Sequence, residues 1–570
     1  MELKEMKVIH ESLAFLLATM LSAGTVLAAP LFLVEPYLQN PGPDRMTIAW
    51  ETSDTDNKLE YWRDGSSPII VPALQVSSRD IWYASLTGLE SNTSYAYRVV
   101  TSRGLGETYL FRTWPAPGDP VDAAKLVVFS DSQGDWPERL QDICETGVIG
   151  MECAAGLADE CPEDIAAILV TGDLVKSGQD LTQWREQFFG RCKNLFHYVP
   201  VLPAIGNHDS PIDNYLAYFM VPSESGEEQW YYTDLLNLRL ITLNTGAFDL
   251  CQWAWFDTLL SQSCSDQGVD YVLTQFHHAC KSEVWTPGQN IQSCIFVARL
   301  QNFTRDCGKP SAHLFGHTHA YSRGQSRDVT HLWVNVGVSA GDIDFWGEEP
   351  PRDYDEFEVS YDEYGFVVVH LARGDEASLR MVRRTGGDDT TYYGFTDETI
   401  EDEFSIESSN NAPDVPQPLY PVGSEIEGLS VTLNASPFSD IDGDFHHSSH
   451  WQVTTIRGDY SAPVVDAWGN ETRHQNIWLD QDTQTGVDIT SYHVTLWLNQ
   501  TFYWRVRYRD EHFGWSGWSE EASFSTVPGR PWGAASIGSI GSHSPSLALN
   551  MLWVLVPVLA FFVWKKRVKG

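Results

Sequence analysis

The sequence predicts a central α/β domain that lies between two all-β sandwich domains. Residues from about 122 to 385 alternate apolar runs with longer polar or helical segments, which is typical of an α/β domain. Residues 31–115 and 416–528 instead contain short runs in which apolar and polar side chains alternate, as expected of sandwich strands. A chain of 570 residues has room for roughly two to four domains.

The first residues resemble a secretion signal. Lys4 and Lys7 precede an apolar stretch over residues 13–27, and Ala28-Ala29-Pro30 then forms a small-residue cleavage site. We expect residues 1–28 to be removed as a signal peptide, with an uncleaved membrane anchor as the alternative. The N-terminal sandwich follows, and residues 46–50 and 94–100 are its clearest alternating strands.

The central domain contains six strongly apolar runs. Their near-continuous hydrophobicity predicts strands that are covered on both faces. The runs are residues 125–130, 167–171, 200–205, 238–243, 271–275 and 331–336.

Five short polar blocks follow apolar runs of this domain. Ligands of open α/β sheets gather beyond the carboxyl ends of strands, and the first four blocks lie at such positions. Together they supply enough carboxylate, amide and imidazole ligands for two adjacent cations. The blocks are Asp131-Ser132-Gln133, Gly172-Asp173, Gly206-Asn207-His208-Asp209, Phe276-His277-His278 and Gly316-His317-Thr318-His319.

These five blocks, in this order, resemble the calcineurin-like metallophosphoesterase superfamily. Three phrases of the N-terminal sandwich resemble the fibronectin-like domain of purple acid phosphatases, and the resemblance covers residues from about 31 to 385. The phrases are Pro36-Tyr37-Leu38-Gln39-Asn40, Leu86-Thr87-Gly88-Leu89 and Tyr109-Leu110-Phe111-Arg112-Thr113. The implied fold is a metallophosphoesterase β-sandwich flanked by helices, with fibronectin III-like sandwiches before and after it.

The resemblance implies a centre for two divalent metal ions, which we expect to be manganese, iron or zinc. Two nearby cations repel each other, so a carboxylate must bridge them, and Asp173 fits this role. The first ion would take Asp131, Gln133 and His319, and the second Asn207, His277 and His317. Of the neighbouring pair, we assign His277 rather than His278 to the metal, because strand alternation turns the two side chains apart.

The expected reaction is attack on phosphorus by a hydroxide that bridges the two ions. Asp173, Asn207 and His208 would be the catalytic residues. Asn207, His208 and Arg323 would contact substrate, and His208 would donate a hydrogen bond or proton to a phosphoryl or leaving-group oxygen. A structural salt bridge is the alternative for Arg323, and a core or surface position is expected for His313.

Two positions depart from the family pattern. Gln133 occupies a place where many members have histidine, and its amide oxygen favours manganese, iron(II) or magnesium over a ferric ion. Lys176 stands where purple acid phosphatases have a metal-binding tyrosine, three residues after Asp173. Because charge transfer from a tyrosinate produces the purple colour, we predict a colourless protein, and a visible absorption spectrum of the metal-loaded chain tests this.

All nine cysteines lie between Cys144 and Cys307. In an exported chain we expect disulfides with at least one thiol left over, and Cys280 is expected to be in a disulfide. The sequence does not choose among the possible pairings.

The C-terminal sandwich follows a predicted linker over residues 386–415. Phe502 to Arg509 alternates aromatic or apolar residues with Tyr503 and three arginines, and Trp515-Ser516-Gly517-Trp518-Ser519 resembles the tryptophan–serine box of cytokine-receptor domains. We predict a stabilising arginine–tryptophan ladder here. The acidic turn over residues 440–444 is either a solvated loop or a calcium site.

The C-terminal tail has the pattern of a membrane anchor. A Gly/Ser-rich linker over residues 529–546 precedes an apolar segment, 547–564, that is long enough to span a bilayer. The basic residues of 565–570 place the body of the protein outside the cytoplasm by the positive-inside rule. A sorting signal that is removed after export is the alternative.

The formal net charge of −40 makes electrostatic binding to nucleic acid unfavourable. We therefore expect an exported, envelope-anchored phosphoesterase that hydrolyses phosphate monoesters of small molecules. A phosphodiesterase or nucleotide pyrophosphatase with the same site is the first alternative. A catalytically retired cell-surface binding or adhesion protein is the second, and the sequence identifies no protein or glycan partner.

Overall fold

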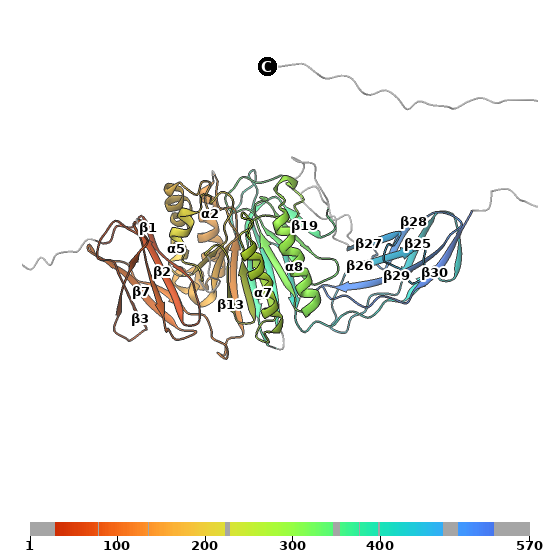
Figure 1. The fold of residues 1–570 in the computed structure, drawn as a ribbon, viewed down its shortest axis with the longest axis horizontal. Helices are drawn as coiled ribbons and strands as arrows, with labels where there is room; N and C mark the ends of the chain where they lie inside the picture. Colours follow the sequence, from red (N-terminus) through yellow and green to blue (C-terminus); the bar gives the residue numbers. More distant parts are fainter. Residues whose placement is uncertain are drawn as a thin grey trace, which may run out of the picture.

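The computed structural model describes residues 29–77, 79–134, 136–222, 228–345, 354–374, 377–396, 399–470 and 488–528. The N-terminal sandwich, the α/β domain and the C-terminal sandwich follow one another along the long axis of the molecule (Figure 1). The predicted signal peptide and the predicted tail segments lie outside the described residues. Within the described ranges, no helix is both long and apolar enough to cross a membrane.

The N-terminal sandwich consists of two antiparallel sheets. Along β7, Tyr95, Tyr97 and Val99 are buried while the residues between them are less so, which is the predicted period of two. One sheet has the order β1 (Val34–Gln39), β2 (Arg45–Glu51), β6 (Ile81–Thr87), β5 (Leu74–Gln75). The other contains β4 (Ile69–Pro72), β3 (Lys58–Trp62), β7 (Ser94–Thr101) and β8 (Gly104–Leu105), with β9 (Tyr109–Arg112) also paired to β7.

The α/β domain is itself a sandwich of two mixed sheets. The first sheet has the order β12 (Val201–Pro203), β11 (Ala167–Val170), β10 (Ala123–Phe129), β20 (Tyr364–Ala372), β21 (Ser378–Gly387), β22 (Ile400–Glu407). The second has the order β13 (Tyr231–Leu235), β14 (Leu238–Thr242), β15 (Tyr271–Gln275), β16 (Ser311–Phe315), β18 (His331–Val336), β17 (Tyr321–Gln325), β19 (Phe357–Tyr361). The six predicted apolar runs all form strands of these sheets.

The strands that precede the polar blocks are parallel to their neighbours. β10, β11 and β12 run parallel in the first sheet, and β14, β15, β16 and β18 run parallel in the second. The second sheet is covered on both faces. Leu238, Leu273 and Leu314 pack into the core shared with the first sheet, whereas Val272 and Phe315 pack against the helix side. This burial explains the continuous hydrophobicity of the sequence.

Helices cover the outer faces of the sandwich, as the resemblance predicts. α7 (Leu250–Ser265) and α8 (Ile291–Cys307) pack on the second sheet. Asp249 caps α7 by accepting from the backbone N–H of Cys251, and Gly308 ends α8 in the left-handed region. The shorter helices are α2 (Pro137–Asp142), η1 (Ile143–Ile149), α3 (Gly150–Glu152), η2 (Ala154–Gly156), η3 (Ala158–Glu160), α4 (Cys161–Asp164), η4 (Gln183–Phe189), α5 (Gly190–Phe196), α6 (Asp213–Tyr218) and η6 (Thr286–Gly288).

The predicted linker over residues 386–415 contains a strand of the α/β domain. β22 pairs antiparallel with β21 and forms an edge of the first sheet. The prediction of a plain linker is wrong for this stretch. Its acidic composition hid the strand because the outward-facing residues of an edge strand remain partly accessible to water.

The C-terminal sandwich contains the predicted arginine–tryptophan ladder. Arg505 lies over Trp518, with 4.1 Å between the guanidinium carbon and the ring centroid, and Arg507 lies 4.3 Å from the ring centroid of Trp515. Such contacts stabilise by roughly 0.5–2 kcal/mol each. One sheet has the order β23 (Pro418–Tyr420), β25 (Ser430–Ala435), β28 (Ser491–Thr495). The other has the order β24 (Ser424–Glu427), β30 (Ala522–Val527), β29 (Thr501–Asp510), β26 (His446–Thr454), β27 (Val465–Asn470).

Eight of the nine cysteines are paired, as expected of an oxidising compartment. The disulfides are Cys144–Cys192, Cys153–Cys161, Cys264–Cys307 and Cys280–Cys294. The prediction that Cys280 is in a disulfide is confirmed, and Cys251 is the remaining thiol, exposed at the start of α7.

The native chain is therefore expected to titrate one thiol with a thiol-specific disulfide reagent. The Cys251→Ser variant should titrate none without denaturant, since the other eight sulfurs are bonded. A second reactive thiol in the native wild-type chain would contradict the pairing.

His313 is a core residue and forms a hydrogen-bonded pair with His331. Both side chains are completely buried, and their Nδ1 and Nε2 atoms lie 3.0 Å apart. Burial lowers the pKa of His331 to about 3 and lowers the pKa of His313 well below its ordinary value. The folded state therefore holds both rings neutral.

This pair predicts a loss of stability in acid. The unfolded chain binds protons at its histidines below pH about 6.5, whereas the folded chain resists protonation until about pH 3. Between these two pH values, each ring that stays neutral in the folded state lowers the free energy of unfolding by about 1.4 kcal/mol for every unit by which the pH falls. Urea unfolding measured between pH 6 and pH 4 gives the free energy of unfolding at each pH. In the His331→Gln variant this free energy should fall less steeply with falling pH than in the wild type, by about this amount. An unchanged slope would contradict the assignment.

Candidate metal centre

The five polar blocks converge at the carboxyl ends of five parallel strands. Asp131, Asp173 and Asn207 follow β10, β11 and β12 of the first sheet, while His277 and His317 follow β15 and β16 of the second. The two sheets face each other, so these ends meet at one edge of the sandwich. The fifth block thus occupies the same kind of position as the first four.

The residues assigned to the first ion surround one point. The Gln133 Nε2 lies 3.1 Å from the His319 Nε2 and 3.3 Å from the Asp173 Oδ2. The His319 Nε2 lies 3.5 Å from the Asp131 Oδ1. Asp131 and Gln133 are buried, so these polar groups have little water to satisfy them.

The residues assigned to the second ion meet at the same carboxylate. The His277 Nε2 lies 3.1 Å from the Asp173 Oδ2 and 3.1 Å from the Asn207 Oδ1. Ligand atoms of Asp173, His277 and His317 all lie within 4.8 Å of one another. The Asp173 Oδ2 therefore stands between the two predicted ligand sets, where a bridging carboxylate is required.

Backbone carbonyls orient three of the imidazole rings. The Nδ1 atom of His277 contacts the Thr171 carbonyl oxygen, that of His319 the Asp342 oxygen, and that of His208 the Lys176 oxygen. A carbonyl only accepts, so each Nδ1 carries the proton and donates it. In His277 and His319, Nε2 is then the nitrogen through which the ring can bind a metal, which is the arrangement that metal-binding histidines use.

The backbone is strained at three of the predicted ligands. Asp131, Asp173 and His317 have φ values of 52°, 52° and 69°, in the left-handed region that residues other than glycine rarely adopt. Such strain is concentrated at functional sites, where surrounding contacts hold it. No periodicity or motif in the sequence revealed these conformations.

Asp209 holds two of the ligand loops together. Its carboxylate accepts hydrogen bonds from the backbone N–H groups of Gly206 at 2.8 Å, Asp173 at 3.1 Å and Leu174 at 2.9 Å. Burial and the neighbouring Asp173 raise the pKa of Asp209 to about 8. Sequence reasoning assigned this residue no role, although its position directly after His208 was a usable signal.

The electrostatic field of the centre favours cations. Burial alone would lower the pKa of His277, but the charges of Asp173, Asp131 and Asp209 raise it to about 9. Burial likewise opposes protonation of His319, whereas Asp131 and Asp344 raise its pKa to about 10. In a chain of net charge −40, cations bound at this centre would offset the repulsion that the chain exerts on an anionic ligand.

The residues present fit a pair of divalent ions. The Gln133 Oε1 is buried in a residue that is only 4% exposed, and it has no hydrogen-bond partner among the described residues. An unpaired buried oxygen costs about 1–3 kcal/mol. The Gln133 Nε2 now faces Asp173 and His319, and turning the amide by 180° would aim this oxygen at a cation bound there. Carboxylate, amide and imidazole donors together suit manganese, iron or zinc.

His278, which follows the predicted ligand His277, makes different contacts. His278 packs 4.5 Å from the ring of His317, and its Nδ1 lies 2.9 Å from the Thr245 Oγ1. The cluster of possible ligand atoms formed by Asp173, His277 and His317 does not include His278.

Arg323, predicted to contact substrate, forms ion pairs within the protein instead. Its guanidinium is buried on β17 and forms ion pairs with Glu358 at 2.8 Å and Asp402 at 2.5 Å. Asp402 belongs to β22, the strand hidden in the predicted linker. The alternative of a structural salt bridge is the one that the structure favours, because both carboxylates become neighbours only through the sheet fold.

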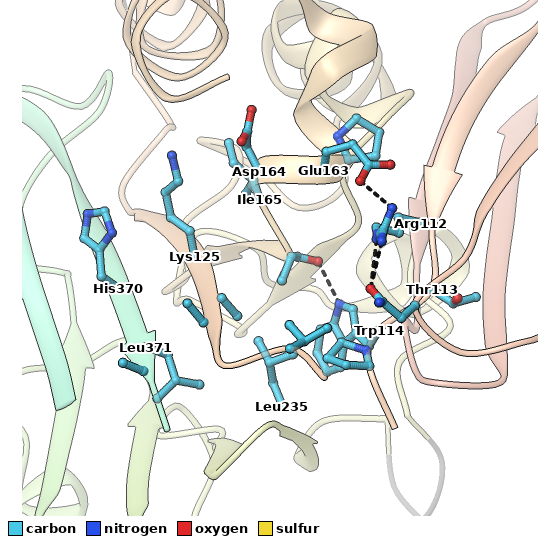
Figure 2. Close-up of a pocket in the computed structure, with 18 of the residues that line it drawn as sticks. Arg112, Thr113, Trp114, Lys125, Glu163, Asp164, Ile165, Leu235, His370 and Leu371 are labelled. Carbon is cyan, nitrogen blue, oxygen red and sulfur yellow. Dashed lines mark hydrogen bonds and ion pairs between the residues drawn. The ribbon is translucent and has the colours of Figure 1, made fainter. Parts of the chain in front are cut away.

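A cavity of about 390 Å³ lies at the opposite end of β10 from Asp131 (Figure 2). Arg112 and Trp114 of the N-terminal domain line it together with Lys125 and His370 of the first sheet. None of the predicted metal ligands lines this cavity. It belongs to the seam between the two domains and is separate from the metal centre.

One family model matches a large part of the α/β domain. Residues 124–321 match the model of the calcineurin-like phosphoesterase family. Two uncharacterized proteins of Mycobacterium tuberculosis, from strains CDC 1551 and H37Rv, are each 25% identical over 281 residues, covering 42% of this chain and 52% of theirs. The chain thus matches about half the length of these curated relatives.

The fold agrees with this assignment. The purple acid phosphatase PPD1 from seeds of yellow lupin (Lupinus luteus) aligns with a TM-score of 0.52 at 18% identity, covering 66% of this chain and 74% of that structure. At this identity the likeness establishes the fold alone. Residues 124–321 therefore match the calcineurin-like phosphoesterase family, and the fold of the chain is similar to that of a purple acid phosphatase.

Proposed function

We propose that this protein is an exported phosphoesterase that hydrolyses phosphate monoesters with two divalent cations. The observation that supports it most strongly is that seven metal-competent side chains, Asp173 among them, gather at one centre. Each comes from one of the five blocks that the family shares, and a decayed site would be expected to have lost some of them. The seven are Asp131, Gln133, Asp173, Asn207, His277, His317 and His319.

When bound, the cations would supply Lewis acidity and lower the pKa of a coordinated water. The protein's own residues would hold the Asp173 carboxylate and the His208 ring in place for the reaction. The backbone N–H of His208 donates to the Asp173 Oδ1 at 2.8 Å and fixes this carboxylate. The His208 ring donates through Nδ1 to the Lys176 carbonyl, and in its imidazolium form it carries a second proton on Nε2 that it would pass to the leaving-group oxygen, returning to the neutral ring.

The location outside the cytoplasm is part of the proposal. Four disulfides in the α/β domain favour an oxidising compartment. The apolar segment over residues 547–564 would anchor the chain, with the catalytic domain on the outer side.

A paired assay tests the proposed reaction. Metal-stripped full-length protein is supplied with manganese, iron(II) or zinc, and hydrolysis of p-nitrophenyl phosphate is compared with that of bis-p-nitrophenyl phosphate. Metal-dependent hydrolysis that favours the monoester is expected. Preference for the diester would transfer the proposal to phosphodiesters, and two bound metals without turnover of either ester would favour a retired enzyme.

A further inference from the structure

His317 differs from the other predicted histidine ligands in how its ring is held. The Nδ1 atoms of His277 and His319 donate to backbone carbonyls, and these bonds orient the two rings. Among the described residues, His317 makes hydrogen bonds through its backbone instead, since its N–H donates to both carboxylate oxygens of Asp131 at 3.1 Å. The torsion that turns a histidine ring about its Cβ–Cγ bond has broad minima. Packing must therefore orient the His317 imidazole.

Three rings lie against His317. The ring centroids of His278, His277 and Trp285 lie 4.5 Å, 5.0 Å and 5.3 Å from that of His317. His277 is itself a predicted ligand of the second ion, and the ring of His278 is held by Thr245. Trp285 has no other ring contact among the described residues, and it comes from the loop between β15 and α8. Its indole is thus the wall that this loop supplies to the His317 ring.

The indole of Trp285 lies directly against the backbone at Gly288. A Cβ added to Gly288 would lie 2.5 Å from the Trp285 Cε3 and 2.9 Å from the Thr318 Cγ2. Side-chain carbons do not approach other atoms so closely in packed proteins, so only glycine fits at this position. The indole therefore has no room to retreat toward Gly288 while it packs on His317, and Thr318, the next residue along the chain, lies beside the same glycine.

The loop that carries Trp285 is anchored independently of any metal. The disulfide Cys280–Cys294 joins the start of the loop to α8. The carboxylate of Glu283 is completely buried and accepts from the backbone N–H of Tyr354 at 2.8 Å. A side chain on a loop that is fixed in this way can hold a metal ligand in one orientation before the ion arrives.

We propose that Trp285 is a positioning residue that holds the His317 imidazole toward the second ion. Metal-binding histidines need partners that orient their rings, and loss of such a partner lowers metal affinity about 10–100-fold. Carbonyl oxygens serve His277 and His319 in this way, and the flat indole serves His317. The inference rests on the two-cation centre of the proposed function, but it does not depend on which ester is hydrolysed.

Manganese titration of the chelator-stripped full-length protein tests this role. The wild type is expected to bind two ions. Trp285→Ala should bind the first ion with unchanged affinity and the second at least about tenfold more weakly. At the same manganese concentration, the electron paramagnetic resonance signal of a spin-coupled manganese pair should be weaker in this variant than in the wild type. Trp285→Phe keeps a flat ring beside His317 and should recover the second affinity to within about threefold of the wild type.

The matched control is Trp253→Ala. It removes another indole of the α/β domain, one that contacts Phe248 and Phe296 on the helix side. This control should bind both manganese ions as the wild type does. Trp285→Leu guards against misfolding of the alanine variant, because leucine keeps apolar volume at the site but has no flat ring. It should show the same selective loss of the second ion.

The outcomes separate this inference from the proposed function. A wild-type chain that binds only one manganese ion would overturn the two-cation centre and the role of Trp285 together. If the wild type binds two ions and the alanine and leucine variants bind them equally tightly, Trp285 does not position His317. The same conclusion follows if both ions are weakened alike, or if phenylalanine does not recover the second affinity.

Discussion

Replacing Asp173 with asparagine is expected to reduce phosphoester hydrolysis at least about a thousandfold. The Asp173 Oδ2 lies 3.1 Å from the His277 Nε2 and 3.3 Å from the Gln133 Nε2, between the two predicted ligand sets. An amide carries no negative charge and offers one oxygen, so it does not hold two mutually repelling cations together. We expect bound metal, measured by elemental analysis, to fall together with turnover.

The control for this variant is Asp257→Asn. It makes the same chemical change at a carboxylate that is 55% exposed and pairs with Arg299 on the helix side of the domain. It should keep both metal content and activity. If Asp173→Asn retained two metals and activity within about tenfold of wild type, Asp173 would not be the bridging ligand.

Replacing Gly206 with alanine is expected to disable the centre without changing any ligand. A Cβ at this position would lie 2.1 Å from the Asp173 Oδ1 and 2.2 Å from the Asp173 backbone nitrogen. Neither group can retreat freely, because Asp209 accepts from both the Gly206 and the Asp173 N–H groups. A displacement of about 1 Å at reacting groups can cost about a hundredfold in rate, and overpacking destabilises by about 1–3 kcal/mol.

The measurements are kcat/KM with p-nitrophenyl phosphate and the free energy of unfolding in urea. Gly517→Ala is the matched control, since its new Cβ would meet only the Val415 Cγ2, at 3.3 Å. We expect the control to keep activity. If Gly206→Ala kept the kcat/KM of the wild type, the Asp173 loop would tolerate being displaced by the new Cβ. Its left-handed backbone would then not be needed for activity.

The sequence predicted the strands of the α/β domain and the polar blocks that follow them because the relevant signals are local. A strand buried on both faces is continuously apolar along its own length, and a ligand at its carboxyl end follows within a few residues. Asp131, Asp173 and Asn207 could therefore be located by reading only the residues before them. The arginine–tryptophan ladder was predictable for the same reason, since alternation along one strand fixes which side chains share a face.

Other features could not be predicted because they depend on which distant segments become neighbours. Arg323 had the sequence position of a substrate contact, yet the sheet places Glu358 and Asp402 beside it. β22 was concealed because the outward face of an edge strand tolerates acidic residues.

By itself, the sequence determined the fold class, the order of the domains and the identity of the candidate ligands, since each follows from short-range hydrophobic patterns and motifs. Only the tertiary structure decided which cysteines pair and that Asp131, Asp173 and His317 adopt left-handed backbone. It also decided that Asp209 joins two ligand loops. These properties arise from contacts between segments far apart in the chain, and no local pattern encodes the distance between such segments.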